Sequence, residues 1–97
     1  MSTEPHKLTR EKASAVAEYI FAHPGQYRQQ ILEGLGGIVS EIDFYIAQDI
    51  LEDKKFIHAR FVEARPKEGI FWGVCYFPDE STKIDSVKDY LKDVLKN

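Results

Sequence analysis

Two runs of β-forming residues in the second half of the chain, joined by a short polar link, constrain its fold most. The runs are FIHARFVE (residues 56–63) and GIFWGVCYF (residues 69–77), and both are rich in β-branched and aromatic side chains. The link ARPKE (residues 64–68) has the length and composition of a hairpin turn. These residues therefore predict an antiparallel hairpin, and the rest of the chain has to cover at least one of its faces.

Two helices are predicted at the start of the chain. Apolar residues recur at i, i+3, i+4, i+7 and i+8 from Ala13, which is the spacing of a one-faced amphipathic helix. Thr9 is placed to cap its first turn, and the helix has to end before Pro24 because the residue before a proline avoids helical backbone angles. A second, shorter helix fits residues 27–34, and the glycines that follow supply a tight turn.

A third helix begins after Ser40, which is placed to form a capping box with Asp43, and it runs to about residue 54. At about 100° per residue, its apolar side chains cover a broad arc, as expected for a helix between other helices and the hairpin. We expect this arc to be buried; it consists of Ile42, Phe44, Ile46, Ala47, Ile50 and Leu51. The arc that remains outward consists of Glu41, Tyr45, Gln48, Asp49 and Glu52.

A last helix follows the hairpin. Thr82 is placed to cap it, with Asp85 three residues later, and its apolar face consists of Ile84, Val87, Leu91, Val94 and Leu95. This face can pack on the hairpin or on the first helix of the same chain. Alternatively, it joins two chains in a homodimer, through Val87, Leu91, Val94 and Leu95.

The predicted order is three helices, a hairpin and a fourth helix, and three stretches resemble the winged-helix superfamily of small regulators. AHPGQYRQQILEGLGG is similar to the end of the first helix, the turn and the second helix of those proteins. ILEDKKFIHARF resembles the exit of their third helix into the wing, and GIFWGVCYF resembles their aromatic second wing strand. The resemblance covers residues 9–77. It implies an α+β winged-helix domain over residues 8–78, after a flexible tail of residues 1–7 and before an additional C-terminal helix within residues 79–97.

The resemblance implies a small regulator of transcription that binds double-stranded DNA, yet the outward arc is unusual for a DNA-reading helix. Such helices usually offer basic and amide side chains to base edges and phosphates. Here Tyr45 and Gln48 are the credible base readers, among the carboxylates of Glu41, Asp49 and Glu52. These carboxylates either solvate an exposed helix face or bind a protein. The alternative function is therefore a protein–protein interaction module that no longer binds DNA.

Basic residues that would contact phosphates lie outside this arc. The candidates are Arg28, Lys54, Lys55, Arg60, Arg65 and Lys67. The last two flank Pro66 at the hairpin tip, where they either reach phosphates or the minor groove or simply solvate the turn. If the ligand is DNA, we expect the wing to lead the contacts.

The alternative function has two candidate surfaces. One is the outward arc, through Glu41, Tyr45, Asp49 and Glu52. The other is the aromatic second strand around Trp72, because Trp and Tyr are enriched in protein interfaces. Core packing is the competing role for these aromatic side chains.

Composition and the scatter of polar residues argue against other classes of function. With 97 residues, 43% hydrophobic and 30% charged, the chain fits one globular domain, and its net charge of −3 argues mildly against a surface dominated by phosphate contacts. Cys75 is alone and the histidines are scattered, so no zinc-site spacing exists and we expect no metal and no cofactor. We also expect no enzymatic activity. No apolar run reaches about 20 residues, so we expect no membrane partner. The single cysteine fits a reducing compartment, so we expect a cytoplasmic protein.

Overall fold

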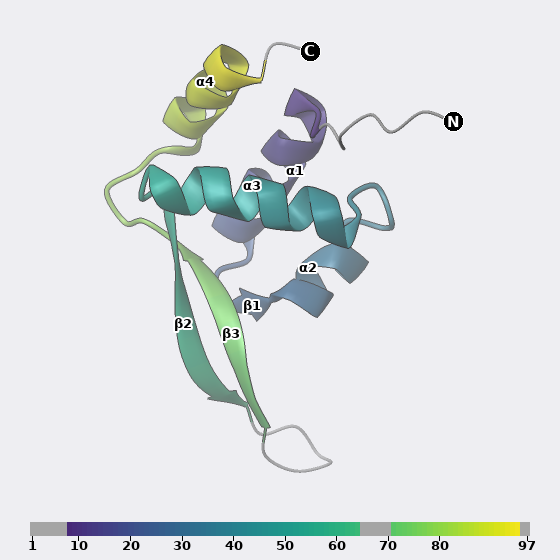
Figure 1. Cartoon of the computed structure of the whole chain (residues 1–97). Coiled ribbons are helices and arrows are strands. Elements are labelled where there is room, and N and C mark those ends of the chain that lie inside the picture. Colours follow the sequence, from purple (N-terminus) through teal and green to yellow (C-terminus); the bar gives the residue numbers. More distant parts are fainter. Residues whose placement is uncertain (1–7, 65–70, 96–97) are drawn as a thin grey trace.

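The computed structural model describes residues 8–64 and 71–95, which form an α+β fold of four helices and three strands (Figure 1). In chain order the elements are α1 (Arg10–Ala22), β1 (Gln26–Tyr27), α2 (Arg28–Gly34), α3 (Glu41–Asp53), β2 (Ile57–Ala64), β3 (Phe71–Pro78) and α4 (Ile84–Val94). The α+β class is confirmed, and the order of elements is compatible with the expected winged helix. The tail of residues 1–7 lies outside the described residues.

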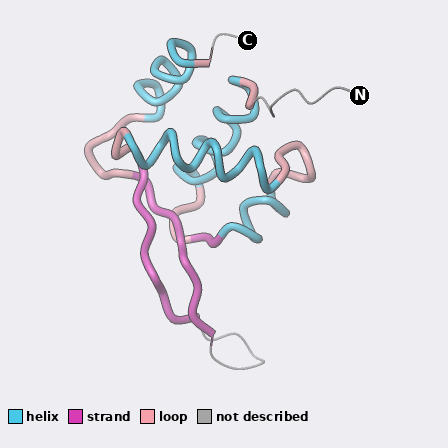
Figure 2. Tube along the Cα trace, in the orientation of Figure 1, coloured by secondary structure: helices cyan, strands magenta, loops and turns pink. Residues whose placement is uncertain are grey.

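The predicted hairpin is formed by β2 and β3, and it projects away from the helices (Figure 2). The two strands pair antiparallel from Ile57 opposite Pro78 to Ala64 opposite Phe71. A third strand, β1, pairs with the other edge of β3, so the strand order is β1-β3-β2. The sequence pattern does not predict β1, because two residues are too few to show an alternation. Tyr27, expected within the second helix, instead belongs to β1 and pairs with Cys75.

The hydrophobic core is built around α1, and α4 packs on this helix. The fully buried residues of α1 belong to its predicted apolar face: Ala13, Val16, Ala17 and Ile20. Val87 and Leu91 of α4 are also fully buried, so they pack within the chain and are not available to a second copy. Of the residues considered for a homodimer, Val94 is exposed and Leu95 is half-buried.

The buried side of α3 differs from the predicted arc. Three of the six expected residues are buried: Phe44, Ala47 and Leu51. Ile42 is 57% exposed, however, and Ile46 and Ile50 are half-buried, so the prediction for Ile42 was wrong. The remaining buried position of α3 is Asp43. Compared with the prediction, the buried face of α3 is therefore shifted around the helix toward Asp43, whose carboxylate has polar partners inside the fold.

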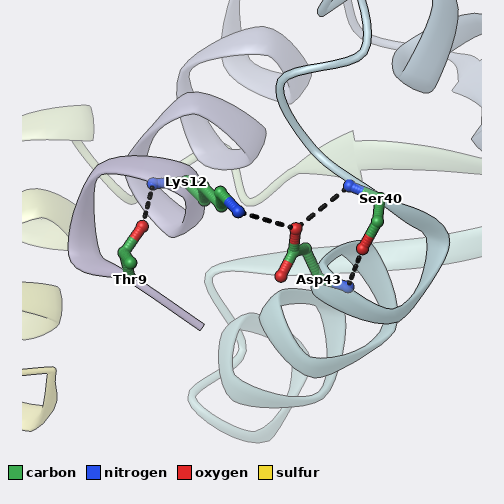
Figure 3. A network of polar contacts seen from close by, with 4 residues as sticks. All are labelled: Thr9, Lys12, Ser40 and Asp43. Carbon is green, nitrogen blue, oxygen red and sulfur yellow. Dashed lines mark hydrogen bonds and ion pairs between the residues drawn. The ribbon is translucent and has the colours of Figure 1, made fainter. Parts of the chain in front are cut away.

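Asp43 joins α3 to α1 through a polar network (Figure 3). Its carboxylate accepts a hydrogen bond from the backbone N–H of Ser40 (3.0 Å) and forms an ion pair with Lys12 Nζ (3.4 Å). Ser40 Oγ accepts from the Asp43 N–H (3.1 Å), which confirms the predicted capping box. Thr9 Oγ1 caps α1 by accepting from the Lys12 N–H (3.2 Å). Because a buried carboxylate needs such partners, the network sets how α3 begins against α1.

The start of α4 differs from the prediction. The helix begins at Ile84, with Lys83 as the preceding cap residue, and Thr82 does not cap it. Instead, Thr82 Oγ1 and Ser81 Oγ both donate to Asp79 Oδ2, each at 2.7 Å. These hydrogen bonds lower the pKa of Asp79 below its ordinary value. The side chain expected to start α4 therefore belongs to the turn that ends β3.

Left-handed backbone joins α3 to its neighbours in the chain. Gly36 (φ 64°) and Gly37 (φ 84°) form the predicted tight turn before α3, where the absence of a Cβ avoids strain. Lys55 adopts φ 62° directly after α3, at a position where glycine is usually preferred. The basic residue at this bend is therefore held in an unusual backbone conformation.

Candidate nucleic-acid interface on the hairpin side of α3

The outward surface of α3 lies between the hairpin on one side and α4 on the other (Figure 1). On the hairpin side is a hollow of about 340 Å³, lined by residues that include Arg28, Gln29, Tyr45, Gly73, Val74 and Tyr76. On the other side is a groove of about 630 Å³, lined by residues that include Asp49, Ile50, Asp53, Tyr90, Val94 and Leu95. We call these the hairpin-side hollow and the α4-side groove. Of the predicted binding residues of α3, Tyr45 lines the hollow, whereas Asp49 and Glu52 line the groove.

Arg28 and Tyr45 meet at the hairpin-side hollow. Arg28 is the first residue of α2, and its Nη1 donates a hydrogen bond to the hydroxyl oxygen of Tyr45, which lies one helical turn into α3. The guanidinium also lies over the Tyr45 ring, 5.4 Å from its centroid, and Nη2 is 3.7 Å from Glu41 Oε1. The charge of Glu41 is thus partly balanced by a cation. Arg28 and Tyr45 both remain partly exposed, so a ligand can reach them.

Gln48 lies beside this pair, but its amide is already engaged. The Tyr76 hydroxyl donates to Gln48 Oε1 (3.1 Å), and Gln48 Nε2 donates to Glu52 Oε2 (2.8 Å). Tyr76 is itself buried against Phe44, with the two rings edge to face at 5.3 Å between centroids. Gln48 therefore links α3 to β3, and reading a base would require it to give up one of these hydrogen bonds.

The pKa of Tyr76 is raised above its ordinary value by burial, and next by the negative charge of Glu52. The folded state therefore favours the neutral phenol. This contribution to stability is complete below the unfolded-state pKa of 10.0 and is lost as the pH rises through the higher folded-state value.

We expect Tyr76→Phe to lower the free energy of unfolding by about 1 kcal/mol at neutral pH, because one hydrogen bond is lost. Above about pH 10, the variant should lose stability less steeply than the native chain. Urea unfolding at about pH 8 and about pH 10.5 measures both effects. If the native chain and the variant lost equal free energy of unfolding between these pH values, the raised pKa of Tyr76 would be contradicted.

The other predicted phosphate contacts do not gather on one surface. Arg60 pairs with Cys75, so the alternation of side chains along the strands places it on the opposite hairpin face from Tyr76. There its guanidinium lies 5.4 Å from the centroid of the Phe77 ring. Lys54 Nζ lies 4.9 Å from the Tyr90 ring centroid, on the α4 side. Arg65 and Lys67 lie outside the described residues, as does the side chain of Trp72.

The acidic residues of the outward arc are also separated by the fold. Glu41 pairs with Arg28, which lines the hairpin-side hollow. Asp49 and Glu52 line the α4-side groove, and Glu52 also accepts a hydrogen bond from Gln48. The single acidic face predicted from the sequence is therefore two surfaces, of which the hairpin side is the less negative.

Sequence reasoning missed several residues of the hairpin-side hollow, notably Gln29, Val74 and Tyr76. They come together because β1 positions the start of α2 against β3, through the pair of Tyr27 with Cys75. The signal that could have found them is the large number of aromatic residues in the second strand. A strand that has apolar side chains on both faces needs other parts of the chain to pack against both faces.

Two features are absent from the described residues. These residues contain no group of three or more His, Cys, Asp or Glu side chains that could hold a metal ion. They also contain no helix with both the length and the apolar character needed to cross a membrane.

No family model matches the sequence, and no curated protein matches it. Among solved structures, the chain is similar to the crystal structure of Pex from Synechococcus sp. (strain PCC 7942), with a TM-score of 0.64. The match covers 99% of this chain and 90% of the Pex chain, at 16% sequence identity. A likeness at this identity shows a shared fold, and function has to be argued from the site. The chain thus has the fold of Pex over nearly its whole length.

Proposed function

We propose that this chain is a winged-helix regulator of transcription that binds duplex DNA through the hairpin-side hollow and the hairpin. The observation that carries the proposal is the shape of this side: α3 leaves its outward surface uncovered next to a hairpin that projects away from the helices (Figure 1). A helix and a protruding hairpin on one side can together follow a DNA groove and its flanking phosphates.

The chemistry of the hollow supports this proposal. Arg28 combines a guanidinium, which suits phosphate oxygens, with a fixed position between Tyr45 and Glu41. The Tyr45 hydroxyl adds a second group that can bond to phosphate or to a base edge. Lys55 is an exposed basic residue just after α3. Arg65 and Lys67, in the sequence between β2 and β3, would add two further phosphate contacts.

Arg28→Ala tests the proposal directly. We expect the affinity for a random duplex to fall about 10-fold and the slope of log K against log salt to become shallower by about 1, because one phosphate contact is lost. Fluorescence anisotropy at several salt concentrations measures both quantities. Arg10→Ala is the matched control, since Arg10 is a partly exposed arginine of α1 away from the hollow. Equal losses in both variants would refute a specific role for Arg28.

A protein–protein interaction module that no longer binds DNA is the second candidate. It is favoured by Phe61 and Val74, which are opposite one another in the hairpin and are 68% and 42% exposed. Exposed apolar pairs of this kind are common in protein interfaces. If no duplex binding appears even at about 50 mM salt, this second candidate replaces the first.

A further inference from the structure

The α4-side groove is a second surface of α3, separate from the hairpin-side hollow. It lies between the C-terminal half of α3 and the C-terminal half of α4. In Figure 1, α4 is seen above the end of α3 from which β2 leaves. Its volume of about 630 Å³ is within the range of about 300–1,000 Å³ of ligand sites in proteins. None of the residues that the DNA proposal uses lines it.

The groove combines an apolar lining with acidic side chains. Ile50 on α3 faces Tyr90 and Val94 on α4, and Val94 is 43% exposed. Tyr90 is held in place by an edge-to-face contact with Phe56, at 5.5 Å between ring centroids. The apolar side of α4 is thus divided: Leu91 and its neighbours fill the core, while Val94 remains on the surface beside α3.

The carboxylates of Asp49 and Asp53 lie on the α3 side of this groove and are both exposed. Neither forms an ion pair with any of the described residues, in contrast to Glu41, which pairs with Arg28. Glu52 adds a third carboxylate to the lining, and the Lys54 ammonium over the Tyr90 ring brings one positive charge beside it. Because the three carboxylates outnumber this cation, an anionic ligand such as nucleic acid or acidic lipid would be repelled here. A cationic partner that also buries apolar side chains complements both properties.

We propose that the α4-side groove binds a basic amphipathic helix of a partner protein. Apolar side chains of that helix would cover Ile50, Tyr90 and Val94, and its flanking Lys or Arg residues would pair with Asp49 and Asp53. A helix fits better than an extended strand, because the groove is lined by two helices and offers no open strand edge. The inference goes beyond the proposed function, since DNA would bind the other side of α3.

A peptide titration of the full chain tests this proposal. The probe is a fluorescent peptide of about 16 residues, with Leu at i, i+3, i+4, i+7, i+8 and i+11 and Lys elsewhere. A scrambled peptide of the same composition is the control for helix-face specificity. We expect the patterned peptide to bind the native chain and the scrambled peptide to bind at least about 10-fold more weakly.

Two variants of the groove separate charge from apolar contact. The first variant combines Asp49→Lys with Asp53→Lys, and the second is Val94→Asp. Each should weaken binding of the patterned peptide about 10-fold or more. The matched control is Glu11→Lys with Glu80→Lys, which changes net charge equally at exposed sites outside the groove. It should retain affinity within about twofold.

Several results would overturn the proposal. They are an absence of binding, equal affinity for the scrambled peptide, or an equal loss in the Glu11 and Glu80 control. Sedimentation of the native chain as a dimer that Val94→Asp dissociates would also overturn it, because a second copy would then occupy the groove. Arg28→Ala should leave peptide affinity unchanged, so failure of the DNA proposal is distinguishable from failure of this one.

Discussion

Asp43→Ala is expected to lower the free energy of unfolding by about 3 kcal/mol, because it removes a buried carboxylate that connects two helices. The carboxylate is 1% exposed, and its loss leaves the Ser40 N–H without its acceptor and Lys12 without its partner. Lys12 is partly exposed and can be hydrated in the variant, which limits the cost. Urea unfolding measures the difference.

The control for this prediction is Asp49→Ala, which makes the same chemical change on the exposed side of the same helix. Its effect should stay within about 0.5 kcal/mol. Lys12→Met should also destabilise, because it removes the Lys12 ammonium from the buried Asp43 carboxylate. If Asp43→Ala and Asp49→Ala were equally mild, the network in Figure 3 would have no role in stability.

The affinity for duplex DNA is expected to fall about 150-fold between about 50 mM and about 200 mM salt. This value assumes four phosphate contacts, each contributing about 0.9 to the slope of log K against log salt. The four are Arg28, Lys55, Arg65 and Lys67. Arg60 is not counted, because it lies on the hairpin face opposite Tyr76. Lys54 is left out because its ammonium lies over the Tyr90 ring on the α4 side.

The same titration distinguishes hairpin contacts from contacts at α2. Replacing Arg65 and Lys67 together with alanine should reduce the slope by about 2, twice the reduction expected for Arg28→Ala. Lys54→Ala is the control, since it removes a nearby lysine that the proposal does not use. A native slope near zero, or an equal effect of Lys54→Ala, would contradict phosphate binding by the hairpin.

The sequence predicts the elements that have a clear period or a clear cap. The apolar spacing that begins at Ala13 is reproduced by the buried face of α1, and the Ser40–Asp43 capping box marks the start of α3. The hairpin is also correct to within one or two residues at each end. These features are local, so one segment of the chain contains all the information needed to predict them.

What the sequence does not predict depends on contacts between distant segments. An aspartate on a helix wheel appears solvated, and the wheel does not reveal the approach of Lys12 from α1, which helps to compensate the burial of Asp43. Similarly, Gln48 appears free to read a base until Tyr76, 28 residues later in the chain, donates to its amide oxygen. Thr82 is a residue type that commonly accepts the capping hydrogen bond of a helix, but its hydroxyl instead donates to Asp79, in the preceding turn.

The same reasoning explains why the ligand of α3 was ambiguous in the sequence. A helix wheel gives one outward arc, whereas the fold places the hairpin along one edge of that arc and α4 along the other. Tyr45 then belongs to the hairpin-side hollow, and Asp49 belongs to the α4-side groove. The two functions considered for one face can therefore be tested separately, at two surfaces.

An NMR titration of the ¹⁵N-labelled chain with a short duplex tests the central proposal most directly. At about 50 mM salt, we expect the largest shifts at Arg28, Tyr45 and the β2–β3 hairpin, and small shifts at Asp49 and Val94. An absence of shifts at saturating duplex, or shifts confined to the α4-side groove, would contradict DNA binding through the hairpin side of α3.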